Sequence, residues 1–216
     1  MAAGRGVEVD DGDTTRDELR AAVNEAHERG LKVTGHLCSV TYEEAADIGI
    51  DNLEHGFQAN TSLDPDKKPD TCSSSRGDYT LEHMSPVEAD RLIAALIRYH
   101  VAITSTLPGL AATVAFEGSL DGSRLRPAVL QAIAPSVRDA YLYRSNRPRP
   151  AQSNAALLLR RDMDLQRAFV AAGGLLLAGP DPVGESGNIP GFGDQREIEL
   201  LVEAGFAPVQ ATRIAT

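Results

Sequence analysis

Three short apolar runs of this chain each end on a side chain that can bind a metal ion. These side chains are His36, His55 and Asp181. Brief hydrophobic stretches are typical of parallel strands in a β/α barrel, and barrel enzymes carry their chemistry at the carboxyl ends of those strands. Two imidazoles and a carboxylate that meet at one barrel mouth would suit a divalent ion, zinc above all, and hydrolysis by metal-activated water.

The spacing of the two histidines supports this hypothesis. His36 and His55 lie 19 positions apart, which is the length of one strand-helix-strand unit. That unit brings both residues to the same end of neighbouring parallel strands. Either histidine alone could simply be hydrogen-bonded at a strand end, but two in equivalent positions favour metal ligation.

Asp181 has two interpretations. It lies between Pro180 and Pro182, and an Asp-Pro turn would explain it without any catalytic role. Beside two ligating histidines, however, its carboxylate could bind metal and accept the proton of the attacking water. We predict His36, His55 and Asp181 as metal ligands and Asp181 as the catalytic base. Glu54 is expected to point away from the site by strand alternation.

The elements that position these residues alternate between strand and helix. Strands are predicted at 31–37, 51–57, 101–107 and 175–179, with a weaker one at 7–9, and helices connect them. This rhythm predicts an α/β fold with a parallel sheet. A closed barrel of this type needs eight strands and about 250 residues, so five strands indicate a partial (β/α)8 barrel.

Polar and irregular segments interrupt the alternation. Residues 58–80 and 182–194 are rich in turn-forming residues, and we expect both to be loops beside the active site. Residues 109–160 are expected to form an irregular or helical insertion. The whole of 1–216 is predicted to be a single domain.

Composition narrows the function. The chain has 216 residues, 42% of them hydrophobic, and a formal net charge of −10 without a Lys/Arg cluster. Nucleic acid and anionic membrane surfaces are therefore not expected as partners. No apolar run is long enough to span a membrane and no signal peptide is evident, so a cytoplasmic location is expected by default. Cys38 and Cys72 could be two buried thiols or one disulfide, and their spacing leaves both open.

Four segments resemble the amidohydrolase superfamily, in the branch that includes imidazolonepropionase-like and proline-dipeptidase-like enzymes. They are residues 26–36, 49–56, 178–182 and 197–208, which resemble the fifth, sixth and eighth strand regions and the helix after the eighth. The resemblance implies a distorted metal-dependent barrel, with zinc the usual metal and C–N bonds the usual target. It also implies that His36 and His55 are ligands and that Asp181 binds metal and shuttles the proton.

The chain departs from the family pattern at its beginning. Nothing corresponds to the His-x-His pair of the first strand, so we expect strands 4 to 8 of a domain truncated at both ends. The bridging lysine of the fourth strand should fall near residues 7–9, where Glu8 could replace it.

The leading hypothesis is a metal-dependent hydrolase of C–N bonds in cyclic amides, peptides or related substrates, and it leaves open whether this fragment is active alone. Its expected partners are a small amide-like substrate and either a second copy of the chain or a missing N-terminal half. The alternative is a non-catalytic remnant that acts only through a partner. A third reading, metal-free acid–base catalysis by Asp181, predicts activity that survives chelators.

Overall fold

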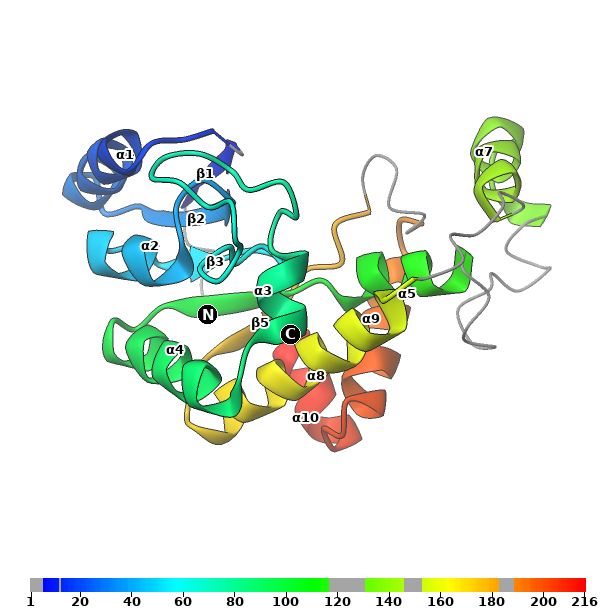
Figure 1. Cartoon of the computed structure of the whole chain (residues 1–216). Helices are drawn as coiled ribbons and strands as arrows, with labels where there is room; N and C mark the ends of the chain where they lie inside the picture. The colour runs from blue at the N-terminus through cyan, green and yellow to red at the C-terminus, as the bar shows by residue number, and fades with distance from the viewer. Residues whose placement is uncertain (1–5, 12, 117–130, 146–152, 183–188) are drawn as a thin grey trace.

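Five parallel strands form one sheet, in which each strand pairs with the next along the chain (Figure 1). The computed structural model describes residues 6–11, 13–116, 131–145, 153–182 and 189–216. The strands are β1 (Gly6–Asp11), β2 (Lys32–Leu37), β3 (Asn52–Leu53), β4 (Ala102–Ser105) and β5 (Leu176–Ala178). Parallel neighbours joined by helices are the arrangement of a β/α barrel, so the predicted fold class is confirmed.

Helices lie between the strands and continue beyond the last one. They are α1 (Arg16–Glu28), α2 (Tyr42–Ile48), α3 (Asp78–His83), α4 (Pro86–Arg98), α5 (Leu107–Phe116), α7 (Pro135–Ser145), α8 (Ala155–Ala171), α9 (Phe192–Glu203) and α10 (Pro208–Ile214). Three begin with a capping box, in which Thr15, Thr41 and Ser85 bond the backbone N–H three residues on and a glutamate there bonds back. These reciprocal bonds satisfy N–H groups that a helix start leaves unpaired.

The core lies between the sheet and the helices. Val33, Leu37, Leu53 and Ile103 point from three adjacent strands into this layer and are fully buried. Because strand side chains alternate, Thr34 and His36 of β2 fall on the opposite face, which is the barrel interior. The apolar core thus fixes which face carries the polar groups.

Several element bounds differ from the sequence prediction. The strand predicted at 51–57 ends at Leu53, because His55 and Gly56 both have left-handed backbones, with φ of 64° and 62°. The strand predicted at 101–107 ends at Ser105, and α5 begins two residues later. The first strand is longer than predicted and covers Gly6–Asp11.

The segments predicted to be irregular are partly described. Within 109–160 the described residues are largely helical, in α5, α7 and the start of α8, while 117–130 and 146–152 lie outside the described residues. Residues 183–188 of the predicted loop 182–194 also lie outside them. Figure 1 shows α7 standing apart from the sheet and its covering helices.

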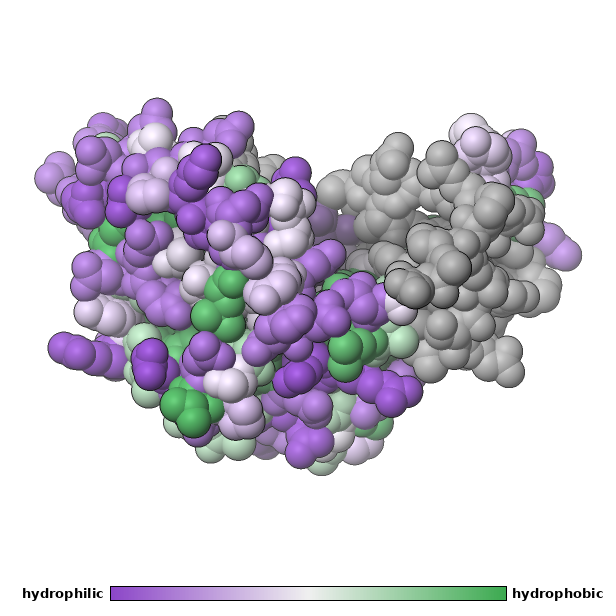
Figure 2. All heavy atoms as spheres, viewed as in Figure 1, coloured by the Kyte–Doolittle hydropathy of each residue, from purple (hydrophilic) through white to green (hydrophobic). Residues whose placement is uncertain are grey.

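The visible surface is mainly polar, with apolar residues scattered over it (Figure 2). None of the helices in the described part of the chain combines the length and apolarity that a membrane crossing requires.

Candidate active site

His36 and His55 meet at the carboxyl end of β2 and β3. His36 Nδ1 lies 3.1 Å from His55 Nε2, and the two rings meet edge to face with centroids 4.3 Å apart. Two imidazole lone pairs at that distance repel, so the nitrogens must share either a proton or a cation. Two nitrogens that each lie about 2.0–2.1 Å from a tetrahedral zinc ion are about 3.3–3.4 Å apart, close to the observed separation.

The hydroxyl of Thr106 sets the orientation of His55. Thr106 Oγ1 donates to the carbonyl oxygen of Gly179 at 3.0 Å, so its hydrogen is already used. It therefore accepts from Nδ1–H of His55, which lies 3.3 Å away. In that tautomer the Nε2 lone pair of His55 faces His36, which is the arrangement that a metal-binding histidine needs.

A backbone turn presents His55, and two buried side chains hold it. The Tyr42 hydroxyl lies 3.0 Å from the carbonyl oxygens of both Glu54 and Gly56. On the other side, Asp162 of α8 accepts from the backbone N–H of Phe57 at 2.8 Å. The left-handed backbone of His55, uncommon for a residue other than glycine, is thus imposed by its neighbours.

Asp181 lines the same cavity as the two histidines but does not join them. The cavity has a volume of about 550 Å³, and His36, His55, Thr106 and Asp181 all line it. Among the described residues, no three His, Cys, Asp or Glu side chains come close enough to hold a metal ion. Asp181 is exposed, lies three residues beyond the end of β5 and has a left-handed φ of 45°.

A polar network lies on the interior face below the histidines. Asn52 Nδ2 donates to Thr34 at 2.7 Å and to Thr104 at 2.8 Å, and Glu54 accepts from both Thr34 and Asn52. The expectation that Glu54 points away from the site is therefore wrong. Glu54 faces the interior with Asn52, as alternation around the buried Leu53 requires, and the left-handed backbone of His55 brings its ring to the same side.

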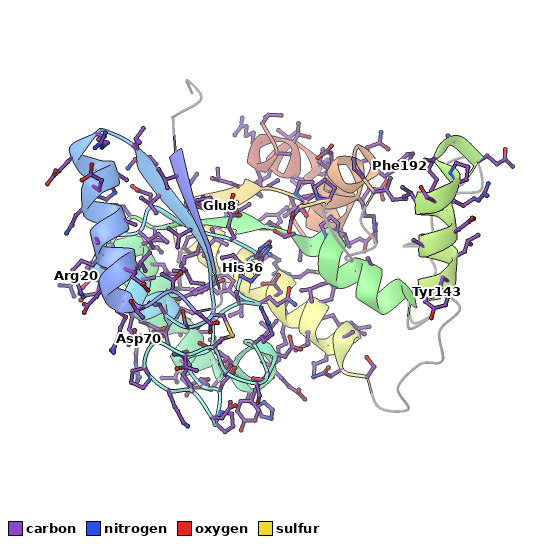
Figure 3. All side chains as sticks on the ribbon, turned by 90° about the horizontal axis from the view of Figure 1, so that it is seen from above. Glu8, Arg20, His36, Asp70, Tyr143 and Phe192 are labelled. Carbon is purple, nitrogen blue, oxygen red and sulfur yellow. A yellow bond between two sulfur atoms is a disulfide. The ribbon has the colours of Figure 1, made fainter. Side chains whose placement is uncertain are left out.

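The register of β1 places Glu8 below the level of the histidine pair. Glu8 pairs with Thr34, whereas Asp10 pairs with His36. Figure 3 shows Glu8 on β1 and His36 on the neighbouring strand. The position level with His36 is thus two residues further along β1 than the one singled out from the sequence.

The loop after β3 is tied down at one wall of the cavity. Cys38 and Cys72 form a disulfide with Cα atoms 4.9 Å apart, which decides the alternative that the sequence left open (Figure 3). Asp70 binds Arg16 of α1 through both carboxylate oxygens. Burial would raise the pKa of Asp64, yet hydrogen bonds from Ser73, Ser75, Thr80 and Gly77 outweigh it and lower that pKa.

The remaining histidines lie outside the cavity. His27 Nε2 is 2.8 Å from Asp51, which also binds Lys32, and His83 stacks on Tyr79.

The sequence prediction did not include Asp162 and Glu197, two buried carboxylates on α8 and α9. Each lies among the apolar residues of an amphipathic helix, so burial of a carboxylate on the core face was the signal available.

Comparison with known proteins shows which folds this chain resembles. No protein-family model and no curated protein matches the chain. Solved structures do. A bottromycin amidohydrolase is 24% identical over 94% of this chain and 42% of its own length, with a TM-score of 0.59. A Xaa-Pro dipeptidase with bound methionine is 16% identical over 99% of this chain and 42% of its own length, with a TM-score of 0.53. An ochratoxinase from A. niger is 14% identical over 94% of this chain and 32% of its own length, with a TM-score of 0.51.

The fold is that of part of an amidohydrolase barrel. The resemblance noted in the sequence is thereby confirmed at the level of the fold. The chain spans about two fifths of the length of the bottromycin amidohydrolase and the dipeptidase.

Proposed function

We propose that this chain supplies His36, His55 and Asp181 to the metal centre of a hydrolase that cleaves C–N bonds in cyclic amides, peptides or related small molecules. The observation that carries the proposal is the 3.1 Å separation of His36 Nδ1 and His55 Nε2 in the cavity that Asp181 also lines. The donor set, two imidazoles and a carboxylate, suits zinc. When bound, such an ion supplies an acidified water and polarises the substrate carbonyl.

Each of four residues at the cavity has a defined task in this proposal. His36 and His55 hold the ion, and Thr106 fixes the tautomer of His55. Asp181 takes a proton from the attacking water and returns it to the leaving nitrogen. Exposure at the cavity gives Asp181 access to both.

We further propose that strands outside this sequence complete the barrel. The outer edges of β1 and β5 have no pairing strand among the described residues. Val7 on β1 and Leu177 on β5, both apolar, are each 38% exposed there. Unpaired edges and exposed apolar side chains favour addition of further strands.

Metal content measured by elemental analysis tests the centre. Purified wild-type chain, reconstituted with zinc and desalted, should retain near-stoichiometric metal. His36→Ala and His55→Ala should each weaken zinc binding by roughly 100-fold or more. His27→Ala, which removes a histidine bonded to Asp51 outside the cavity, is the matched control and should retain zinc. Unchanged zinc in both cavity variants would refute the centre.

Turnover tests the hydrolysis. Chelator-sensitive cleavage of dipeptides or lactams, lost in Asp181→Asn while zinc is retained, would support the proposed role of Asp181. Zinc binding without turnover, in the chain alone and in the completed barrel, would instead support a non-catalytic remnant.

A further inference from the structure

A permanent positive charge lies in the wall of the cavity that contains the histidine pair. Among the described residues that line this cavity, Arg76 is the one arginine or lysine. It is exposed, and none of the ion pairs between described residues involves it. A guanidinium that no described carboxylate neutralises remains available to an anion from solution.

The cavity carboxylates do not use this charge. Asp78 also lines the cavity, and its pKa is raised by burial and by the nearby carboxylates of Asp64 and Glu82. A paired guanidinium would lower that pKa instead. Asp181, the other carboxylate of the wall, forms no ion pair with Arg76 within the described residues. The cavity wall therefore carries this positive charge and two carboxylates, with no ion pair between them among the described residues.

The backbone on both sides of Arg76 is anchored to one buried carboxylate. Ser75 Oγ donates to Asp64 Oδ2 at 2.5 Å, and the backbone N–H of Gly77 donates to the same oxygen at 3.0 Å. Asp64 is 5% exposed and also accepts two hydrogen bonds from Thr80. Arg76 is thus the tip of a loop whose flanking residues are fixed.

The conformation of Arg76 indicates that its position is imposed by this loop. Its φ is 53°, in the left-handed region, and it is followed by Gly77 at 98°. An arginine gains nothing locally from that backbone, so the surrounding bonds must hold it there. The disulfide from Cys72 to Cys38 restrains the same loop from its other side. A preorganised loop lowers the entropic cost of binding a ligand.

We propose that Arg76 determines specificity by binding a free carboxylate on the amide substrate, while the scissile C–N bond lies at His36, His55 and Asp181. The inference rests on the proposed function, because it names the substrate class of the same site. Arginine suits a carboxylate because its planar fork donates two parallel hydrogen bonds. The favoured substrates are then N-acyl amino acids and peptides with a terminal carboxylate near the bond to be cleaved.

A matched ligand pair tests this inference. N-acetyl-L-phenylalanine and its C-terminal amide differ in the carboxylate alone. Their binding to the full chain is measured by calorimetry at low ionic strength with chelator present, so that no turnover occurs, and again with zinc. The wild type should bind the acid roughly tenfold more tightly than the amide.

Variants of Arg76 should remove this preference. Arg76→Gln should bind the two ligands equally and keep the wild-type affinity for the amide. Arg76→Lys, which keeps the charge but not the fork, should show an intermediate preference. Arg20→Gln is the matched control, because Arg20 lies on α1 in a pair with Asp17, away from the cavity (Figure 3). Thermal unfolding of each variant confirms that it is folded.

The outcomes separate this inference from the proposed function. A wild type that binds acid and amide equally, or binds neither, overturns the role of Arg76, as does a preference that survives in Arg76→Gln. Zinc content of the same samples reports on the histidine pair independently. Loss of the metal centre with a retained carboxylate preference would overturn the proposed function alone.

Discussion

Asp162 on α8 accepts a hydrogen bond from the backbone N–H of Phe57 at 2.8 Å, across 105 positions of sequence. Its second oxygen accepts from Gln166 at 2.9 Å. Phe57 is two residues beyond His55, so a buried carboxylate of a distant helix fixes the turn that presents a proposed ligand. The correct direction of His55 therefore depends on the packing of α8 against the sheet.

The burial of Asp162 predicts a pH-dependent stability. Burial raises the pKa of Asp162 from 3.8 to about 7 and that of Glu197 from 4.5 to about 7. At a pH between the ordinary pKa of each carboxyl group and about 7, the folded state keeps a proton that the unfolded state has lost. Stability from both groups is therefore fully present at low pH and is lost as pH rises towards 7, by up to about 1.4 kcal/mol per pH unit and group.

Asp162→Asn should flatten this dependence. The asparagine oxygen can still accept from Phe57. Its amide can donate to Gln166 after the Gln166 amide flips, because the buried Gln166 carbonyl oxygen has no hydrogen-bond partner among the described residues. Urea unfolding from pH 5.5 to 8 should show a shallower slope than the wild type, whereas exposed Asp90→Asn should leave the slope unchanged. An equal slope in Asp162→Asn and wild type would contradict the assignment.

Two glycines separate backbone strain from crowding at the His55 turn. Gly56 and Gly30 both have left-handed backbones, with φ of 62° and 68°. A Cβ at Gly56 would lie 2.6 Å from Asp162 Oδ2, whereas one at Gly30 would meet nothing within 4 Å. Gly30→Ala should cost about 1 kcal/mol for the backbone alone. Gly56→Ala should cost about 1–3 kcal/mol more from crowding, measured by urea unfolding.

The same pair of variants links the turn to the metal centre. Gly56→Ala should also reduce zinc retention, because displacement of Asp162 disturbs the turn that presents His55. Gly30→Ala should retain zinc. Equal unfolding free energies for the two alanine variants would mean that the turn relaxes without strain.

The approach of His36 and His55 to one edge of the sheet was predictable from the periodicity of the strands and helices. Both histidines follow apolar runs that end at the same edge of a parallel sheet, and their spacing predicts that much. The register of β2 and β3 puts Glu54 level with His36, so the contact itself also needs the left-handed backbone of His55. The five strands followed from the same alternation of apolar runs and helices.

The direction of Glu54 and the support from Asp162 were not predictable in this way. Glu54 shares the face of Asn52 by alternation, and the expectation was wrong because it assumed that His55 also alternates, whereas His55 and Gly56 have left-handed backbones. Asp162 depends on tertiary packing, because nothing near it in sequence shows that α8 reaches the turn after His55. Local patterns thus predicted which two histidines approach one another, whereas their orientation required the assembled fold.

The disulfide provides the last prediction, on the stability of the loop that carries Arg76. Cys38 follows His36 by two residues, and its bond to Cys72 closes a separation of 34 residues. In the chain-entropy treatment, opening a loop of this size costs about 3–4 kcal/mol. Urea unfolding with and without dithiothreitol should show this loss in the wild type, and reductant should have no effect on Cys38→Ala/Cys72→Ala.

Reduction should also expose residues 58–80 to limited proteolysis and weaken the carboxylate preference, because the loop would no longer be restrained from both sides. A wild type whose unfolding and cleavage ignore the reductant would show that Asp64 and the Arg16–Asp70 pair hold the loop without the disulfide.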